Sequence, residues 1–329
     1  MPKNIPISVV IPVFNEEENI VHLYEELKKV LETHFTDFEV IFSNDGSRDQ
    51  TFAKIRALNY KDPRVKGLTF SRNFGHQAAL YAGLSKAQGK VVVSMDGDMQ
   101  HPPSFIPELY KKHQEGFDIV NTRRIDAEDT GFLKKITSKW YYKLINYLSD
   151  VPIEPAAADF RLMTLQAVRS LNDMPERHRF TRGLVGWMGY RQAIVDYKAQ
   201  KRYAGSTKYT FIKMLSFGLD GIVSFSVKPL RIAFYTGFFV SMASLIYAVF
   251  AIFNFVRGET VPGWTSTLVS VLLLGGVTLL CLGVIGEYIA RIFNEVRRRP
   301  MYFISDEVGL SEEDFNFIKH GEKEDQRNK

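Results

Sequence analysis

The sequence predicts an α/β protein: a domain built on a mostly parallel sheet, followed by an interfacial segment and a two-helix transmembrane hairpin. Three observations carry this prediction. Short apolar runs alternate with amphipathic stretches from residue 7 to residue 120, which is the pattern of strands and helices around a parallel sheet. A basic amphipathic stretch then covers residues 201–228. Two long uncharged runs follow it, separated by a short polar loop.

The composition is that of a globular or membrane protein, because 45% of the 329 residues are apolar. The formal charge of +5 is modest, which favours contact with anionic surfaces over a dedicated nucleic-acid binder. A single cysteine, Cys281, excludes an internal disulfide and fits a reducing compartment. The first apolar run is too short for a secretory signal, so we expect no cleavable leader.

The elements of the expected sheet alternate in chain order. Strands are predicted from short runs rich in β-branched residues, and helices from longer stretches with apolar residues at helical spacing. The predicted strands are 7–14, 38–45, 65–71, 90–98 and 117–124, and the predicted helices are 19–35, 51–60, 76–88 and 105–116. In such sheets ligands bind at the carboxyl ends of the strands, so we expect the site there.

Polar side chains follow all five predicted strands. They are Asn15 and Glu16, Asp45, Arg72 and Asn73, Asp96 and Asp98, and Arg123. Each residue alone is as well explained as a helix N-cap, where asparagine and aspartate are favoured. Three turns with acids and two with arginines together favour a ligand site. No G-x-G-x-x-G follows a strand, which argues against a dinucleotide-binding dehydrogenase.

The acidic pair in "KVVVSMDGDMQHPP" stands where charge is unfavourable unless something compensates it. Side chains alternate along a strand, so Asp96 and Asp98 point the same way, and we expect Gly97 to keep the backbone open to a ligand. Two carboxylates suit Mg²⁺ or Mn²⁺ bridging phosphate oxygens. His101 could also reach a metal, but a histidine beside two prolines is more often a turn residue.

Two uncharged runs, Ile232–Val256 and Val261–Gly286, predict transmembrane helices at about 230–256 and 265–290. The first run would be roughly 37 Å long as a helix, which exceeds the ~30 Å hydrocarbon core of a bilayer. The alternative is a pair of buried helices in a large soluble core, but that arrangement leaves neither run a polar face for solvent.

Basic residues predict the orientation. Lys228 and Arg231 precede the first span and Arg297 follows the second, whereas Arg257 in the connecting loop is offset by Glu259. We therefore expect a multi-pass protein of the inner membrane with both termini in the cytoplasm. The expected boundaries are 1–200 for a cytoplasmic domain, 201–228 for the interfacial segment, 229–293 for the hairpin and 294–329 for a cytoplasmic tail, loosely held after Ser305.

The interfacial segment has apolar residues at helical spacing with lysines among them, as a helix at a membrane surface requires. The residues are Phe211, Leu215, Leu219 and Ile222, with Lys208 and Lys213. A helix packed on the domain's own core is the alternative interpretation.

Seven segments carry a family resemblance: "VVIPVFNEEENI", "SNDGSRDQT", "FSRNFGHQAAL", "SMDGDMQHPP", "AAADFRLM", "RHRFTRGLVGWMG" and "RYAGSTKY". They resemble the family 2 inverting glycosyltransferases of GT-A fold, and among these the polyprenyl-phosphate glycosyltransferases. That group includes bactoprenol glucosyltransferases and dolichol-phosphate mannose synthases. The resemblance covers roughly residues 5–295, and the hairpin is most similar to the bactoprenol branch.

The resemblance implies transfer of a hexose, with glucose from UDP-glucose as the first expectation, to undecaprenyl or another polyprenyl phosphate. Inversion would give a β-linked lipid sugar at the cytoplasmic leaflet. Mg²⁺ or Mn²⁺ as cofactor, a homo-oligomer formed through the hairpin and a downstream flippase are also implied. Three alternatives stay open: another donor such as GDP-mannose or a UDP-aminosugar, a processive polysaccharide synthase, and a membrane-tethered sugar-nucleotide sensor without turnover.

The resemblance also implies residue roles on the donor side. Asp45 would accept a hydrogen bond from the base, and the N3–H of uracil suits a carboxylate. The nucleotide pocket would be lined by Pro12, Phe14, Glu16 and Asn73, and the cation and donor phosphates would be held by Asp96, Asp98 and Gln100. Asn44 departs from the family's usual "DDGS", which removes one charge and leaves Asp45 in place.

The remaining implied roles concern the acceptor and catalysis. Arg123, Arg202 and Lys208 would contact phosphates, and Lys134 and Ser138 would contact the acceptor. Asp159 is similar to the family's proposed catalytic base. Because a phosphate nucleophile with a second pKa near ~6 is already mostly ionised at neutral pH, we expect Asp159 to orient a substrate. General-base catalysis is the alternative.

Overall fold

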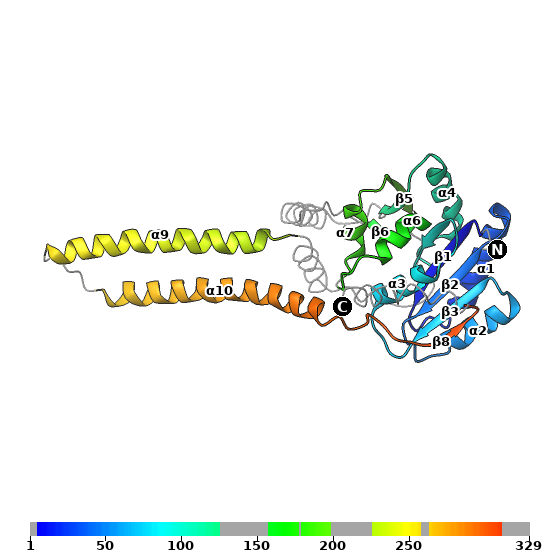
Figure 1. The fold of residues 1–329 in the computed structure, drawn as a ribbon, viewed down its shortest axis with the longest axis horizontal. Helices are drawn as coiled ribbons and strands as arrows, with labels where there is room; N and C mark the ends of the chain where they lie inside the picture. The colour runs from blue at the N-terminus through cyan, green and yellow to red at the C-terminus, as the bar shows by residue number, and fades with distance from the viewer. Residues whose placement is uncertain (1–4, 126–156, 178, 199–225, 258–262, 311–329) are drawn as a thin grey trace, which may run out of the picture. The chain divides into compact units, whose positions relative to one another are not determined.

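The computed structural model describes residues 5–125, 157–177, 179–198, 226–257 and 263–310. The chain divides into two compact units. The first contains the sheet and includes the chain from Pro300 onward, and the second contains the two long helices near the C-terminus (Figure 1).

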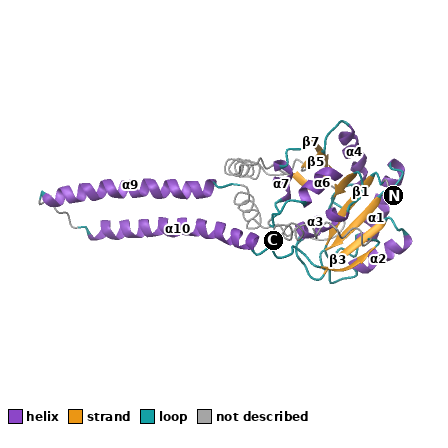
Figure 2. Ribbon diagram, viewed as in Figure 1, coloured by secondary structure: helices purple, strands orange, loops and turns teal. Residues whose placement is uncertain are grey.

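Within the described residues, eight strands form one mixed sheet in the order β7-β5-β6-β4-β1-β2-β3-β8 (Figures 1 and 2). The bounds are β1 Ile7–Val13, β2 Glu39–Asn44, β3 Val65–Phe70, β4 Val91–Ser94, β5 Ile119–Ile125, β6 Ala157–Thr164, β7 Gln192–Lys198 and β8 Ile304–Val308. The central strands β4, β1, β2 and β3 are parallel. Strand β6 runs antiparallel to both β4 and β5. The predicted α/β class is confirmed.

The first four helices of the sheet domain lie at the predicted positions, and the two later ones that the structure describes were not predicted. They are α1 Ile20–His34, α2 Thr51–Lys61, α3 His76–Lys86 and α4 Ile106–Gln114, with η1 Pro103–Phe105 before α4 and with α6 Leu165–Asn172 and α7 Thr181–Trp187 farther along. The apolar stripe Leu23, Leu27 and Leu31 of α1 packs against Ile11 and the other residues on one face of β1. Helix α3 covers the opposite face, where Gly83 packs against Val10.

Strand β1 lies at the centre of the sheet, and all seven of its residues are buried. Burial on both faces explains why its sequence is an almost continuous apolar run instead of an alternating one. This rigid centre fixes the carboxyl ends of β1, β2 and β4 beside one another, because their pairings run in register from Ser8 to Val13 on one side and from Ile7 to Val10 on the other.

The expectation of a loosely held tail after Ser305 is wrong for the residues up to Val308. The segment Ile304–Val308 forms β8, which pairs antiparallel with β3 at the edge of the sheet. The Ser305 hydroxyl donates to the carbonyl of Thr69 at 3.2 Å, and Asp306 pairs with Arg56. Charged side chains are common on edge strands because they discourage pairing with other chains. In this segment they interrupt the apolar pattern from which the other strands were predicted, so the strand was not recognised from the sequence.

The two predicted spans are helices, α9 Lys228–Val256 and α10 Trp264–Val296. Both are long and apolar enough to cross a membrane, with mean hydropathy 2.0 over Lys228–Asn254 and 2.4 over Val269–Val296. Neither stretch is buried within the protein. Large side chains such as Leu279, which is 72% exposed, therefore need an apolar environment. The helices associate with a membrane, and the orientation stays a prediction.

Candidate active site

The turns after β1 and β2 are joined to each other by hydrogen bonds. The backbone of Asn15 is left-handed, with φ 54°, and its N–H donates to Ser47 Oγ at 2.8 Å. Asn15 Oδ1 in return accepts from the N–H of Arg48 at 3.0 Å. Phe14 is 42% exposed beside this turn, and its role in lining the nucleotide pocket stays a prediction.

Other predicted nucleotide contacts occupy the same edge. Pro12 is buried near the end of β1, and the half-buried Glu16 follows it, with its N–H donating to Thr51 Oγ1 at 3.0 Å. Asn73 is exposed in the loop after β3, and its carbonyl accepts from Arg72 at 3.2 Å. These positions are compatible with the predicted nucleotide pocket, whose contacts stay predictions.

Asp45 joins the turn after β2 to the loop after β3. Its Oδ1 accepts from the N–H of Phe74 at 2.7 Å and its Oδ2 accepts from the N–H of Gly75 at 2.9 Å. Burial raises the pKa of Asp45, and these two donors with nearby His76 only partly oppose the rise. Gly46, at φ +66°, permits the close approach of the two loops, since a Cβ there would lie 2.4 Å from the carbonyl carbon of Arg72.

Asn44, where the usual family pattern has an aspartate, bonds to two neighbouring segments. Its Nδ2 donates to Thr69 Oγ1 at 2.8 Å, and its Oδ1 accepts from the N–H of Ser47 at 3.3 Å. The amide therefore joins the ends of β2 and β3 while Asp45 holds the loop beyond.

Two histidines hold Asp96. His76 Nε2 lies 3.0 Å from Asp96 Oδ1, and the N–H of Asp96 donates to His101 Nδ1 at 3.0 Å. His101 is buried and stacks on Phe160, with 5.1 Å between ring centroids. It therefore acts as the buried turn residue that the sequence favoured. Burial alone raises the pKa of Asp96, but His76, His101 and Arg182 outweigh it and lower that pKa to about 2.

Asp98 lies two residues farther along, where its Oδ1 accepts from the N–H of the half-buried Gln100 at 3.1 Å. Met99 between them has a left-handed backbone, φ 64°. Gly97 serves packing, and its expected role of leaving the backbone open to a ligand stays a prediction. A Cβ at Gly97 would lie 2.8 Å from Val13 Cγ1, so only a glycine lets this turn sit on β1.

Replacing Gly97 by alanine is expected to destabilise the sheet domain by about 1–3 kcal/mol, the usual effect of forcing a methyl group into a packed core. Thermal unfolding of the purified chain measures this change as a lowered Tm. Gly237→Ala is the matched control, because a Cβ at that position of α9 meets nothing within 4 Å. An unchanged Tm for Gly97→Ala would show that Val13 yields without strain.

Strand β6 brings Asp159 to the same edge. Since Ser94 pairs with Arg161 in the antiparallel β4–β6 ladder, continuing the register places Asp159 opposite Asp96. Ser94 Oγ also donates to the Asp159 carbonyl at 2.6 Å. Asp96 and Asp159 therefore lie at one edge, and Asp98 follows Asp96 by two residues. The predicted parallel order could not show this, because β6 runs the other way.

Two arginines face the Asp159 carboxylate. Arg161 Nη2 donates to Asp159 Oδ1 at 3.0 Å, and Arg182 Nε lies 3.7 Å from the same oxygen. Arg161 is buried, and burial lowers its pKa while Asp159 opposes this effect. Burial likewise lowers the pKa of His76, but Asp96, Asp159 and Asp45 outweigh it and the net shift is upward. The acids are thus surrounded by cationic groups at fixed positions.

His76 and Arg182 are site residues that the sequence analysis missed. Both lie in segments quoted for the family resemblance, "FSRNFGHQAAL" and "RHRFTRGLVGWMG". Their position after Gly75 and at the start of α7 gave no separate signal, because a lone histidine or arginine is usually a solvated surface residue.

Arg123 is held by an acid that the sequence analysis did not single out. Its Nε and Nη2 donate to the two carboxylate oxygens of Asp196 at 2.7 and 3.0 Å. This pair is exposed and lowers the pKa of Asp196. Strand β6 separates β5 from β4, so Arg123 is not brought against Asp96, and its phosphate contact stays a prediction.

Four predicted site residues lie outside the described residues: Lys134, Ser138, Arg202 and Lys208. The interfacial segment up to residue 225 also lies outside them. The roles implied for these four residues and for the segment stay predictions.

The donor set at the acidic edge fits a divalent cation. Among the described residues, no three His, Cys, Asp or Glu side chains form a ready metal cluster. Asp96 and Asp98 supply two carboxylates, and Mg²⁺ is commonly bound by one or two carboxylates with substrate phosphates and water completing its shell. Two acids and a diphosphate together would therefore suffice.

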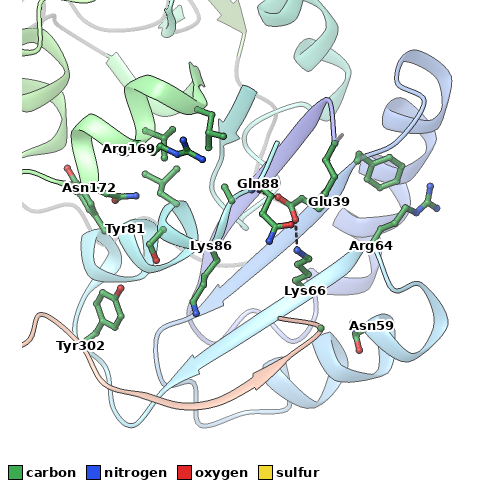
Figure 3. Close-up of a pocket in the computed structure, with 18 of the residues that line it drawn as sticks. Glu39, Asn59, Arg64, Lys66, Tyr81, Lys86, Gln88, Arg169, Asn172 and Tyr302 are labelled. Atoms are coloured by element: carbon green, nitrogen blue, oxygen red, sulfur yellow. Dashed lines mark hydrogen bonds and ion pairs between the residues drawn. The ribbon is translucent and has the colours of Figure 1, made fainter. Parts of the chain in front are cut away.

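A groove of about 1330 Å³ lies away from this edge, at the amino ends of the strands and along α3 (Figure 3). Its two buried lysines are matched by acids. Lys66 lies 2.7 Å from Glu39 and Lys86 lies 3.5 Å from Glu307. Because these charges compensate one another, the acidic edge and not the groove is the candidate site.

Comparisons with known proteins show the family of the chain. Residues 8–171 match Glycosyl transferase family 2, and residues 228–292 match the GtrB C-terminal hairpin. An uncharacterized glycosyltransferase of Synechocystis is 43% identical over 307 residues, covering 93% of this chain and 96% of that protein. The SfII prophage-derived bactoprenol glucosyl transferase of Shigella flexneri is 44% identical over 299 residues, covering 91% and 97%.

Among solved structures, glucosyl-3-phosphoglycerate synthase from Mycobacterium tuberculosis with Mn²⁺, UDP-glucose and phosphoglyceric acid is 18% identical. Its TM-score is 0.42, over 66% of this chain and 77% of that one. The assignment rests on the relatives above 40% identity, which align with almost the whole chain. From these relatives and the matched segments, the chain belongs to glycosyltransferase family 2 and carries that family's GtrB-type C-terminal hairpin.

Proposed function

We propose that this protein transfers glucose from UDP-glucose to undecaprenyl phosphate, or another polyprenyl phosphate, with inversion at the cytoplasmic face of the membrane. The observation that carries the proposal is the position of Asp96 and Asp159 at one sheet edge, with Asp98 two residues after Asp96, in a chain that also has two exposed apolar helices. Relatives named bactoprenol glucosyl transferase align with 91% of the chain, which supports the same acceptor class.

In this proposal a phosphate oxygen of the lipid forms a bond to the anomeric carbon while the bond from that carbon to the diphosphate breaks. UDP departs with the electron pair, and displacement from the opposite face converts an α donor to a β product. Asp96, Asp98 and Gln100 would hold Mg²⁺ or Mn²⁺, which would neutralise charge on the departing diphosphate. No proton needs to leave the acceptor, because its phosphate is already mostly ionised at pH 7.

Neighbouring side chains hold Asp96 and Asp159 in place. His76 and His101 hold Asp96 from two sides. Arg161 and Arg182 face the carboxylate of Asp159, so its oxygens are fixed relative to the donor. We therefore assign Asp159 to orienting a substrate. Arg123, Arg202 and Lys208 are assigned to the phosphates, and Lys134 and Ser138 to the acceptor.

The proposed lipid acceptor explains why the enzyme has membrane helices. Taking a polyprenyl tail out of the bilayer costs about 0.8 kcal/mol for each methylene exposed to water. An enzyme with this acceptor must therefore work at the lipid surface, with its sheet domain on the side that holds UDP-glucose. The flanking basic residues favour a cytoplasmic position for that domain and both termini. A flippase acting later would move the product across the membrane.

A homo-oligomer formed through the hairpin is part of the proposal. Gly275, Gly276 and Gly283 of α10 would meet nothing within 4 Å if each carried a Cβ. Small residues at such positions let membrane helices approach closely. Crosslinking in native membranes would show the oligomer.

UDP release by the full-length chain in detergent or nanodiscs tests the function. With UDP-glucose, undecaprenyl phosphate and Mn²⁺ or Mg²⁺, we expect UDP release together with radiolabelled sugar in the organic phase, and neither product with EDTA. UDP binding without release would favour a sensor, and a growing polymer would favour a processive synthase. If sugar is transferred only from GDP-mannose or from a UDP-aminosugar, the proposed donor, UDP-glucose, is wrong.

A further inference from the structure

We propose that the chain immediately after the membrane hairpin positions the donor site. The return segment, Pro300–Val308, enters the sheet domain and ends as β8. Its residues Tyr302 and Phe303 support the loop 71–75, which in turn holds Asp45 and leads to His76. The inference deepens the proposed function by adding positioning residues to its donor site, and it takes the donor's identity from that proposal.

The first link joins the return segment to the loop. The N–H of Ser71 donates to the carbonyl of Phe303 at 3.0 Å, which extends the β3–β8 pairing by one bond into the loop. The Phe303 ring lies 6.1 Å from the Phe74 ring, centroid to centroid. Tyr302 stacks on Phe70 at 4.8 Å with 12° between the ring planes. Two successive side chains of the return segment therefore pack on both ends of the turn after β3.

The second link joins the loop to the site. The N–H groups of Phe74 and Gly75 donate to the two carboxylate oxygens of Asp45. The guanidinium of Arg72 lies over the Phe74 ring at 4.1 Å. Helix α3 begins directly after Gly75, and its first residue, His76, contacts Asp96. A shift of Phe74 would therefore move the partners of two predicted donor contacts.

Besides Phe303, the loop is held by Phe74, whose ring lies edge-on at 5.8 Å from Phe70 and packs on the buried cluster that contains Phe70. Gly75 has φ +104°, and a Cβ there would meet nothing within 4 Å, so packing does not fix the backbone at this residue. Phe303 itself is 56% exposed, although one face of its ring meets Phe74. A half-exposed aromatic residue contributes little to a core, which fits a positioning role better than a purely stabilising one.

The return segment follows closely after the hairpin. Helix α10 ends at Val296, and only Arg297–Arg299 precede Pro300, where the sheet domain resumes. The residues that support the donor loop are thus the first that the chain places in the domain after its membrane helices. This covalent order links the end of the hairpin to nucleotide affinity.

Phe303→Ala in the full-length chain tests the proposal. We expect the Kd for UDP and the KM for UDP-glucose to rise about fivefold, since an aromatic pair of this kind contributes at the level of a few-fold in an equilibrium, with kcat unchanged within about twofold. Amide hydrogen exchange of peptides covering 70–77 should become about tenfold faster, because a less restrained loop would break the hydrogen bonds from the Phe74 and Gly75 N–H groups to Asp45 more often. Phe303→Tyr keeps the ring and should restore both readouts.

Asp306→Ala is the matched control, because it weakens the same segment through Arg56 on α2 without touching loop 71–75. The proposal requires this variant to bind UDP as the parent does. Equal weakening by Asp306→Ala, or unchanged exchange and affinity in Phe303→Ala, would overturn it. If the parent binds no UDP, the proposed function fails, and the exchange of 70–77 still decides whether Phe303 positions the loop.

Discussion

Replacing Asp98 by alanine is expected to lower glycosyl transfer by about a hundredfold to a thousandfold, the usual cost of removing one group that stabilises charge in a transition state. Asp98 follows β4 at the edge where Asp96 and Asp159 meet, and it is the second carboxylate of the candidate cation site. Without it, a divalent ion would keep one protein carboxylate, and its affinity would fall.

Initial rates of UDP release at several Mn²⁺ concentrations measure this effect. The activation curve of Asp98→Ala should move to higher Mn²⁺, and Mn²⁺ binding followed by electron paramagnetic resonance should weaken in parallel. Glu115→Ala is the control, since it removes an exposed carboxylate at the end of α4. Full activity of Asp98→Ala with an unchanged Mn²⁺ curve would exclude Asp98 from the cation site.

Replacing Asp159 by asparagine is expected to lower kcat by about a hundredfold or more while the Kd for UDP changes less than twofold. The amide keeps the shape of the side chain but loses the charge that faces Arg161 and Arg182. A substrate oriented by that carboxylate would then sit in the wrong geometry, and misplacement by about 1 Å costs roughly a hundredfold in rate.

Single-turnover transfer and calorimetric titration with UDP separate these two effects. Because Arg161 is buried, loss of its partner also lowers stability, so the rates should be measured well below the Tm of the variant. Asp173→Asn, at the end of α6, is the control for the same change at an exposed acid. Unchanged turnover in Asp159→Asn would end any catalytic role for this residue.

Local patterns predicted the first half of the sheet domain well. Helices α1 to α4 and strands β1, β2, β3 and β5 lie at the predicted positions, because each has its own periodicity and its own turn residues. Strand β4 ends at Ser94 and not at the predicted residue 98, so Asp96 and Asp98 lie in the turn after the strand and not on its alternating face. The edge that holds Asp45, Asp96 and Asp98 followed from the parallel order of the strands. The long helices were predicted because uncharged apolar runs of that length rarely form any structure other than a membrane-spanning helix.

The features that were not predicted depend on pairing between distant residues. Asp159 meets Asp96 only because β6 runs antiparallel to β4, and no local pattern in "AAADFRLM" states that direction. The Arg123–Asp196 pair likewise depends on the register of β5 with β7. The packing role of Gly97 could not be predicted from local sequence either, because it depends on the position of Val13 on another strand.

The edge position of β8 has a consequence for synthesis of the protein. Strand β3 is complete after about 70 residues, whereas its outer neighbour leaves the ribosome roughly 240 residues later, about ten to fifty seconds at ordinary translation rates. During that delay the polar backbone groups along the free side of β3 have no partner and can recruit other nascent chains. Maturation of this glycosyltransferase therefore finishes only after both long apolar helices have been made, which favours delivery of the nascent chain to the bilayer before its sheet domain is complete.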